Sequence, residues 1–170
     1  CAFMDIYDPK KVFSSIDYGG RYSFGNQPSI MHWNLAQFGR SLLPLLDSDT
    51  DKALLLAQAE VDKYLQAFQG SLAEVMRAKL GLNNLKEDDL KLGMDLLDLM
   101  GDSEVDFTNT FRELANIIDN DKTNISELRL QFSDIKAFDQ WLGQWKMRLK
   151  SETATSEDIA ERMRMANPAV

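Results

Sequence analysis

The chain has 170 residues, of which 44% are hydrophobic and 27% are charged, and its formal net charge at pH 7 is −8. These values predict one soluble globular domain with a core of its own. With 27 acidic against 19 basic side chains, the chain lacks the excess of cations that phosphate binding needs, which argues against nucleic acid as a partner. No apolar run is long enough to span a membrane and the N-terminus has no signal-peptide pattern, so we expect a cytoplasmic protein without a membrane partner.

The single cysteine, Cys1, and the single histidine, His32, leave few side chains for metal or nucleophile chemistry. One cysteine excludes an internal disulfide and a cysteine-based metal site, and one histidine excludes a His-rich site. His32 lies in a helical pattern beside Trp33, so we interpret it as packed against or near an aromatic ring. A self-contained hydrolase or metalloenzyme is therefore disfavoured.

Residues 1–28 are predicted to form a long ordered loop, because prolines, serines and paired glycines interrupt every helical pattern in them. Irregular segments of this length within compact domains are usually functional. Three aspartates, Asp5, Asp8 and Asp17, lie in this loop. Carboxylates at these spacings could ligate a cation or accept a proton, but the capping of turns is the simpler role for them.

The part of this loop from Gly19 to Pro28 has the most unusual composition in the chain. Paired glycines precede an Arg21-Tyr22 dyad, and Pro28 stands where a helix begins. Binding residues are often carried by loops of this kind. We interpret the segment as a shaped binding loop, and a plain connection before a helix is the alternative.

Helices are predicted throughout the rest of the chain, because apolar residues recur there with a period near 3.6. The expected ranges are 29–43, 51–80, 87–100, 106–114, 133–150 and 155–165. No strand-like alternation and no internal repeat is evident between them. The expected fold class is all-α, with six or so helices behind an irregular N-terminal segment.

Four positions should mark the ends of these helices. Pro44 is expected to end the first helix, and Gly81 stands where a C-cap glycine belongs after the second. The last two helices should each follow an N-terminal capping residue. The cap is Ser133 or Asp134 for the first of them and Thr155 for the second. These positions predict where four of the helices begin or end.

The helix that begins near residue 87 opens on the acidic run Glu87–Asp89, which suits the positive end of a helix dipole and is interpreted as a solvated helix start. Its expected buried face consists of Leu90, Met94, Leu97 and Met100. Two tryptophans, Trp141 and Trp145, are four residues apart in a later helix and are expected in the core. The segment Asp119–Asn124 begins like a calcium loop but lacks the glycine and the glutamate that such a loop needs, so no calcium site is assigned.

The first 35 residues carry five motifs that together resemble one known family. They are Phe3–Pro9, Phe13–Asp17, Gly20–Tyr22, Phe24–Pro28 and Trp33–Leu35. These motifs look like the segment that follows the metal-binding motif in the selenoprotein O family of kinase-like proteins. Looser matches continue in the same order towards the end of the chain, so the resemblance covers essentially all of it.

This resemblance implies a protein adenylyltransferase of kinase-like fold. Members of the family bind ATP in a reversed orientation and transfer AMP, with magnesium, to hydroxyl side chains of proteins. Metal ions and basic groups neutralise the charge that develops in such a transfer. In these terms residues 1–28 resemble an activation segment, and residues 29–170 resemble the helical C-lobe of the kinase-like fold.

The nucleotide-binding and metal-binding residues of the family precede the position of Cys1. The letters Asp17-Tyr18-Gly19 imitate the family's metal motif but lie further along the chain, so we do not transfer its role to them. The chain also lacks an initiator methionine and the family's C-terminal extension, and we expect a C-terminal fragment that is inactive alone. No catalytic, cofactor-binding or metal residue is therefore assigned, and ATP and magnesium are expected only in the intact protein.

The resemblance places one set of residues beside the protein substrate or the catalytic loop. This set is Asp5, Tyr7, Asp8, Arg21 and Tyr22. Expected partners are protein substrates and the missing N-terminal catalytic part, with self-association if the first 35 residues expose an apolar patch. The alternative function is a free-standing helical interaction module derived from the same family.

Overall fold

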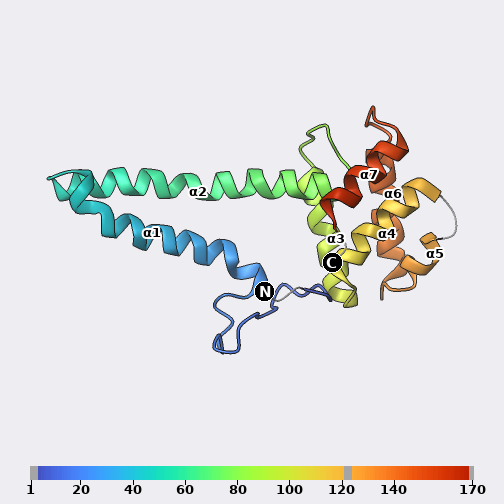
Figure 1. The fold of residues 1–170 in the computed structure, drawn as a ribbon, viewed down its shortest axis with the longest axis horizontal. Helices are drawn as coiled ribbons and strands as arrows, with labels where there is room; N and C mark the ends of the chain where they lie inside the picture. The colour runs from blue at the N-terminus through green and yellow to red at the C-terminus, as the bar shows by residue number, and fades with distance from the viewer. Residues whose placement is uncertain (1–3, 121–123, 169–170) are drawn as a thin grey trace. The chain divides into compact units, whose positions relative to one another are not determined.

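The computed structural model describes residues 4–120 and 124–168, and the regular structure in these ranges is helical (Figure 1). The elements are the 3-10 helix η1 (Phe24–Asn26) and the α-helices α1 (Gln27–Leu46), α2 (Thr50–Lys79), α3 (Asp89–Ser103), α4 (Phe107–Asn120), α5 (Asn124–Arg129), α6 (Ile135–Leu149) and α7 (Ser156–Ala166). Within the described ranges there is no β-strand, and one isolated bridge pairs Ile6 with Asp106. The all-α prediction is confirmed.

The chain divides into two compact units. Unit 1 comprises Cys1–Asp8 and Leu72–Val170, and unit 2 comprises Pro9–Ser71. Helix α2 begins in unit 2 and ends in unit 1, whereas α1 lies in unit 2 and α3 to α7 lie in unit 1. Each unit has its own packing and is described by itself.

Helix α1 in unit 2 carries Pro28 in its first turn, as expected for a proline at a helix start. The prediction that Pro44 ends this helix is wrong, because α1 continues through it to Leu46. A proline removes the hydrogen bond of its own nitrogen, and so close to the helix end this loss disturbs little of the remaining helix. The ring of His32 stacks on Tyr64 with centroids 5.8 Å apart, which confirms its packing against an aromatic side chain.

Apolar side chains of unit 2 are largely exposed. The exposed fractions of Trp33 and Phe38 in α1 are 49% and 61%, and that of Leu55 in α2 is 72%. In this unit the buried residues of α2 are Ala53 and Val61. The periodic apolar stripe of the sequence therefore forms helices here without being enclosed by the rest of the chain.

Helix α2 ends in unit 1 at the glycine that the sequence indicated. Gly81 has a φ of +75°, in the left-handed region, and the Leu82 amide donates to the Arg77 carbonyl oxygen at 2.9 Å. The Gly81 amide donates to the Ala78 carbonyl oxygen at 3.2 Å, which completes a Schellman cap. The predicted C-cap is confirmed.

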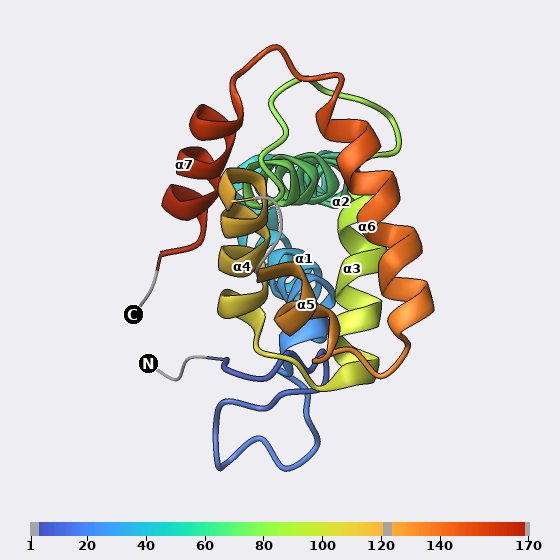
Figure 2. The same cartoon turned by 90° about the vertical axis from the view of Figure 1, so that its right-hand side faces the viewer.

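The core of unit 1 is built on the pairs α4 with α7 and α3 with α6 (Figure 2). The aromatic rings of Phe132, Phe138, Trp141 and Trp145 form a stacked series with successive centroids 4.0, 6.0 and 5.8 Å apart. The indole N–H of Trp141 donates to the Leu92 carbonyl oxygen at 2.8 Å, and that of Trp145 donates to the Leu80 carbonyl oxygen at 3.0 Å. Both tryptophans thus bury their rings and satisfy their one polar group, as expected for core residues.

Two other expectations about helix starts in unit 1 are confirmed. The Asp134 carboxylate accepts the Ala137 amide at 2.9 Å before α6, and the Thr155 hydroxyl accepts the Asp158 amide at 3.2 Å before α7. One face assignment is wrong: Met94 of α3 is 38% exposed, although its neighbours in that stripe are wholly or partly buried. The segment compared with a calcium loop falls largely outside the described residues.

The interpretation of Glu87–Asp89 as a solvated helix start is wrong for Asp89. Its side chain is 2% exposed and forms an ion pair with Arg148, whose Nε lies 2.6 Å from Oδ1. Arg148 also pairs with Glu152, with Nη1 and Oε1 separated by 2.8 Å and the Glu152 side chain 1% exposed. These three side chains form the acid–arginine cluster of unit 1, which ties α6 to the start of α3.

Acid should destabilise unit 1 through this cluster. Burial alone would raise the pKa of Asp89, but hydrogen bonds from Arg148 and the Lys86 amide outweigh it and lower the pKa. The pKa of Glu152 is lowered in the same way, against its burial, by Arg148 and the amides of residues 83 and 84. A carboxylate with a lowered folded-state pKa adds stability above its unfolded pKa, roughly pH 4, and loses it as the pH falls through the folded value.

The free energy of unfolding should therefore fall steeply below about pH 4. Urea titrations from pH 7 down to pH 3 measure this fall, and Asp89→Asn is the matched variant because it removes one of the two titrating groups. We expect a shallower pH dependence in the variant. An equally steep dependence would assign the acid sensitivity to other carboxylates.

Candidate functional site

The loop of unit 2 is closed by the Asp17 carboxylate. Its Oδ1 accepts the Arg21 amide at 2.9 Å, and its Oδ2 accepts the Tyr22 amide at 2.9 Å. Gly20, inside this turn, has a φ of +64°, a left-handed conformation that glycine adopts without strain. The turn fixes the backbone of Arg21 and Tyr22, so the loop has a defined shape rather than a plain extended path.

Side chains from the start of α1 hold the other side of the loop. The Asn26 amide nitrogen donates to the Arg21 carbonyl oxygen, and the Gln27 amide nitrogen donates to the Tyr22 carbonyl oxygen. Two backbone hydrogen bonds close the base of the loop. The amide of residue 24 donates to the carbonyl oxygen of residue 11 at 2.9 Å, and the amide of residue 25 donates to the carbonyl oxygen of residue 9 at 2.7 Å. Arg21 and Tyr22 are therefore fixed through both their amide and their carbonyl groups.

Arg21 places its charge over two aromatic rings of unit 2. Its guanidinium carbon lies 4.6 Å from the ring centroid of Trp33 and 5.8 Å from that of Tyr22. These distances are those of cation–π contacts. Since Trp33 is 49% exposed and Tyr22 is 47% exposed, the three side chains form a surface platform that can offer both hydrogen-bond donors and apolar area to a partner.

Asp5 and Tyr7 occupy a different setting, in unit 1. The Tyr7 amide donates to the Val105 carbonyl oxygen at 2.9 Å, and the Phe107 amide donates to the Asp5 carbonyl oxygen at 2.6 Å. The Tyr7 ring stacks on Phe107 with centroids 5.6 Å apart and is 7% exposed. Burial raises the pKa of Tyr7, and the nearby carboxylates of Asp98 and Asp8 raise it further. Tyr7 therefore anchors the start of the chain to the core of unit 1.

The five site residues of the sequence analysis thus fall into two groups. Arg21 and Tyr22 lie together in unit 2, and Asp5, Tyr7 and Asp8 lie in unit 1. The turn-capping role that the sequence favoured for Asp17 is confirmed by its hydrogen bonds to the Arg21 and Tyr22 amides, whereas no site role was given to the ring of Trp33. The signal for Asp17 was present, because an aspartate followed closely by two glycines is typical of a turn closed by a carboxylate.

A magnesium ion would need clustered oxygen ligands. Across residues 4–120 and 124–168, no group of three or more His, Cys, Asp or Glu side chains could hold a metal ion. The described residues therefore contain no metal site built from protein side chains alone, and no step through magnesium is assigned to them. The same ranges contain no helix that is both long enough and apolar enough to cross a bilayer.

Comparison with known proteins identifies the class to which this helical chain with its shaped loop belongs. The family described as "Protein adenylyltransferase SelO" matches residues 1–170. The chain therefore belongs to the SelO family, and the resemblance found in its N-terminal motifs is confirmed.

Individual relatives carry the name protein nucleotidyltransferase YdiU. The protein of Halalkalibacterium halodurans is 46% identical over 170 residues, which cover 100% of this chain and 33% of the relative. That of Clostridium botulinum is 45% identical over 170 residues, with the same coverage of each chain. That of Geobacillus kaustophilus is 46% identical over 171 residues, which are 100% of this chain and 34% of the relative. The chain thus spans about a third of the length of these relatives.

Proposed function

We propose that this chain is the C-terminal helical part of a protein adenylyltransferase, which transfers AMP from ATP to Ser, Thr or Tyr hydroxyls of protein substrates. The observation that carries the proposal is the family match over residues 1–170. Relatives named protein nucleotidyltransferase, 45–46% identical over the whole chain, support it. Because the chain spans about a third of their length, the activity is proposed for the intact protein and not for residues 1–170 alone.

In the proposed reaction the substrate hydroxyl oxygen forms a bond to the α-phosphorus of ATP. The bond from that phosphorus to the bridging oxygen breaks, pyrophosphate leaves, and the hydroxyl proton passes to a base or to solvent. ATP and magnesium are proposed as cofactors of the intact protein, where the metal would neutralise phosphate charge. We propose that the residues of this chain position the protein substrate and take no part in these bonds.

The loop of unit 2 is the best candidate for that positioning role. Its backbone is fixed by Asp17, and Arg21 lies on exposed aromatic rings that can contact a polypeptide. Arginine and exposed aromatic residues are enriched where proteins bind one another. The proposed contribution of Asp5, Tyr7 and Asp8 is different: the segment that they form is held on the core of unit 1 and would support the catalytic loop of the intact protein.

Replacing Arg21 with alanine in the full-length protein tests this assignment. We expect AMP transfer to a protein substrate to fall about tenfold, since truncating an arginine at a protein contact commonly costs on the order of 1 kcal/mol or more. The assay measures labelled AMP on the substrate protein at several substrate concentrations. The effect should be on the KM for the protein and not on the KM for ATP.

Arg40→Ala is the matched control, because Arg40 is an exposed arginine of α1, the helix that also carries Trp33. It should leave AMP transfer unchanged. If the Arg21 variant transfers AMP as well as the parent at limiting protein substrate, the loop does not position the substrate. If the full-length parent itself transfers no AMP, the proposed activity is wrong.

A further inference from the structure

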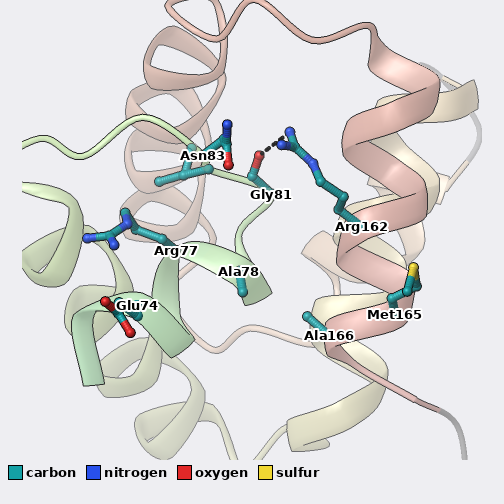
Figure 3. Close-up of a pocket in the computed structure, with 9 residues that line it drawn as sticks. Glu74, Arg77, Ala78, Gly81, Asn83, Arg162, Met165 and Ala166 are labelled. Carbon is teal, nitrogen blue, oxygen red and sulfur yellow. Dashed lines mark hydrogen bonds between the residues drawn. The ribbon is translucent and has the colours of Figure 1, made fainter. Parts of the chain in front are cut away.

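A pocket of unit 1 lies away from the loop just described, between the end of α2, the turn that follows it, and α7 (Figure 3). Its volume is about 460 Å³, within the range of small-molecule sites. It is lined by Glu74, Arg77, Ala78, Gly81, Leu82, Asn83, Arg162, Met165 and Ala166. We call it the α2–α7 pocket.

Arg162 lines this pocket from α7, and its guanidinium extends towards the turn that follows α2 (Figure 3). Its Nη2 donates to the Gly81 carbonyl oxygen at 3.3 Å, a long hydrogen bond, and its Nε is buried (Figure 3). Among the residues that the structure describes, this Nε has no hydrogen-bond partner. A buried donor of a charged group is normally satisfied, and leaving one unpaired costs free energy. An acceptor that pairs with both Nε and Nη2 would therefore satisfy this guanidinium better than the Gly81 carbonyl oxygen does.

The charges around the pocket suit an acceptor that carries one negative charge. Arg77 and Arg162 contribute two positive charges to the lining, and Glu74 contributes one negative charge. Figure 3 shows Arg77 and Glu74 on α2, while the Arg162 guanidinium points from α7 to the Gly81 carbonyl oxygen beside Asn83. The lining therefore carries an excess of one positive charge, which favours a ligand of low negative charge.

The rest of the lining suits an apolar body. The side chains of Ala78, Leu82, Met165 and Ala166 contribute apolar surface around the two arginines. Gly81 is buried and packs closely against α7, because a Cβ atom there would lie 2.6 Å from Ile159 and 3.0 Å from Met163. A guanidinium binds a carboxylate through two parallel hydrogen bonds, and the apolar side chains suit a ligand with a hydrocarbon body better than inorganic phosphate.

From these observations we propose that the α2–α7 pocket binds a small organic monocarboxylate. The carboxylate draws the Arg162 guanidinium away from the Gly81 carbonyl oxygen and accepts hydrogen bonds from its Nε and Nη2. The aliphatic or aromatic body of the ligand lies against Leu82 and Met165. The proposal depends on the pocket alone and not on the transfer of AMP.

Ligand-observed NMR with hexanoate as the probe tests the proposal directly. Saturation transferred from the protein should reach the alkyl protons of hexanoate at millimolar concentration. Hexanol, which has the same chain without the charge, should bind about tenfold more weakly, as expected when a charge-assisted pair is lost. Equal binding of the two probes, or no binding of hexanoate, would overturn the proposal.

The variant Arg162→Lys separates the carboxylate contact from general attraction. Lysine keeps the positive charge but loses the paired donors, so hexanoate should bind about tenfold more weakly. Arg40→Gln, which removes a charge outside the pocket, should leave binding unchanged. Circular dichroism establishes that each variant is folded. If Arg162→Lys binds hexanoate as well as the parent, or if inorganic phosphate displaces hexanoate at equal concentration, the site is not a monocarboxylate site.

Discussion

Replacing Arg148 with alanine should lower the free energy of unfolding by about 3–5 kcal/mol, the usual cost of removing one partner from a buried ion pair. Arg148 is 10% exposed and donates to both oxygens of Asp89, at 2.6 and 3.1 Å, and to Glu152 at 2.8 Å. It also donates to the Asn84 carbonyl oxygen. Alanine would leave two buried carboxylates close together with no cation between them, so the loss exceeds that of an ordinary contact.

Urea unfolding followed by tryptophan fluorescence measures this effect, because Trp141 and Trp145 report on the core of unit 1. Replacing Trp33 with phenylalanine in all variants removes the signal of unit 2. Arg129→Ala is the matched control: its pair with Asp139 has similar geometry, but the two side chains are 39% and 42% exposed. An exposed pair contributes roughly 0–1 kcal/mol, so the control should lose little stability. Similar losses in both variants would contradict the role of burial.

The same cluster shows why local patterns could not identify the environment of Asp89. An acidic run at a helix start is favourable in water, and nothing near it in the sequence indicates burial. The partner, Arg148, lies 59 residues away in the chain. Arg148 lies beside Asp89 only because α6 packs on α3, and this packing is a property of the tertiary structure that the local sequence does not indicate.

The helices themselves were largely predictable, because their apolar period and their capping residues agree. Gly81, Asp134 and Thr155 each have a local hydrogen-bonding role that their residue type suits, and each was placed correctly. Pro44 was misread because the cost of a proline depends on how much helix follows it. Periodicity also could not show that Phe38 is exposed, since it defines an apolar face without showing what covers that face.

The shape of the candidate site was partly predictable. The glycines, the Arg21-Tyr22 dyad and the turn-capping role given to Asp17 indicated a shaped loop, and the structure adds the ring of Trp33 under the Arg21 guanidinium. The α2–α7 pocket left no sequence signal, because Arg77 and Arg162 are 85 residues apart and neither belongs to a motif. Local chemistry therefore predicted the loop, whereas the pocket follows from the packing of α7.

Replacing Gly81 with alanine should also be strongly destabilising. The left-handed conformation at φ +75° would cost a residue with a side chain about 1–2 kcal/mol. The new Cβ would lie 2.6 Å from Ile159 and 3.0 Å from Met163, both in buried positions of α7, and overpacking of this kind costs roughly 1–3 kcal/mol. Together these effects predict a loss of about 2–5 kcal/mol, measured by urea unfolding.

Gly143→Ala is the matched control for this substitution, since Gly143 lies in α6 of the same unit and a Cβ there would meet nothing within 4 Å. Alanine in a helix interior is favoured over glycine, so the control should gain about 0.5–1 kcal/mol. The two variants add the same methyl group and should change stability in opposite directions. If Gly81→Ala loses less than about 1 kcal/mol, α7 can move away from the turn, and the close packing between them does not stabilise unit 1.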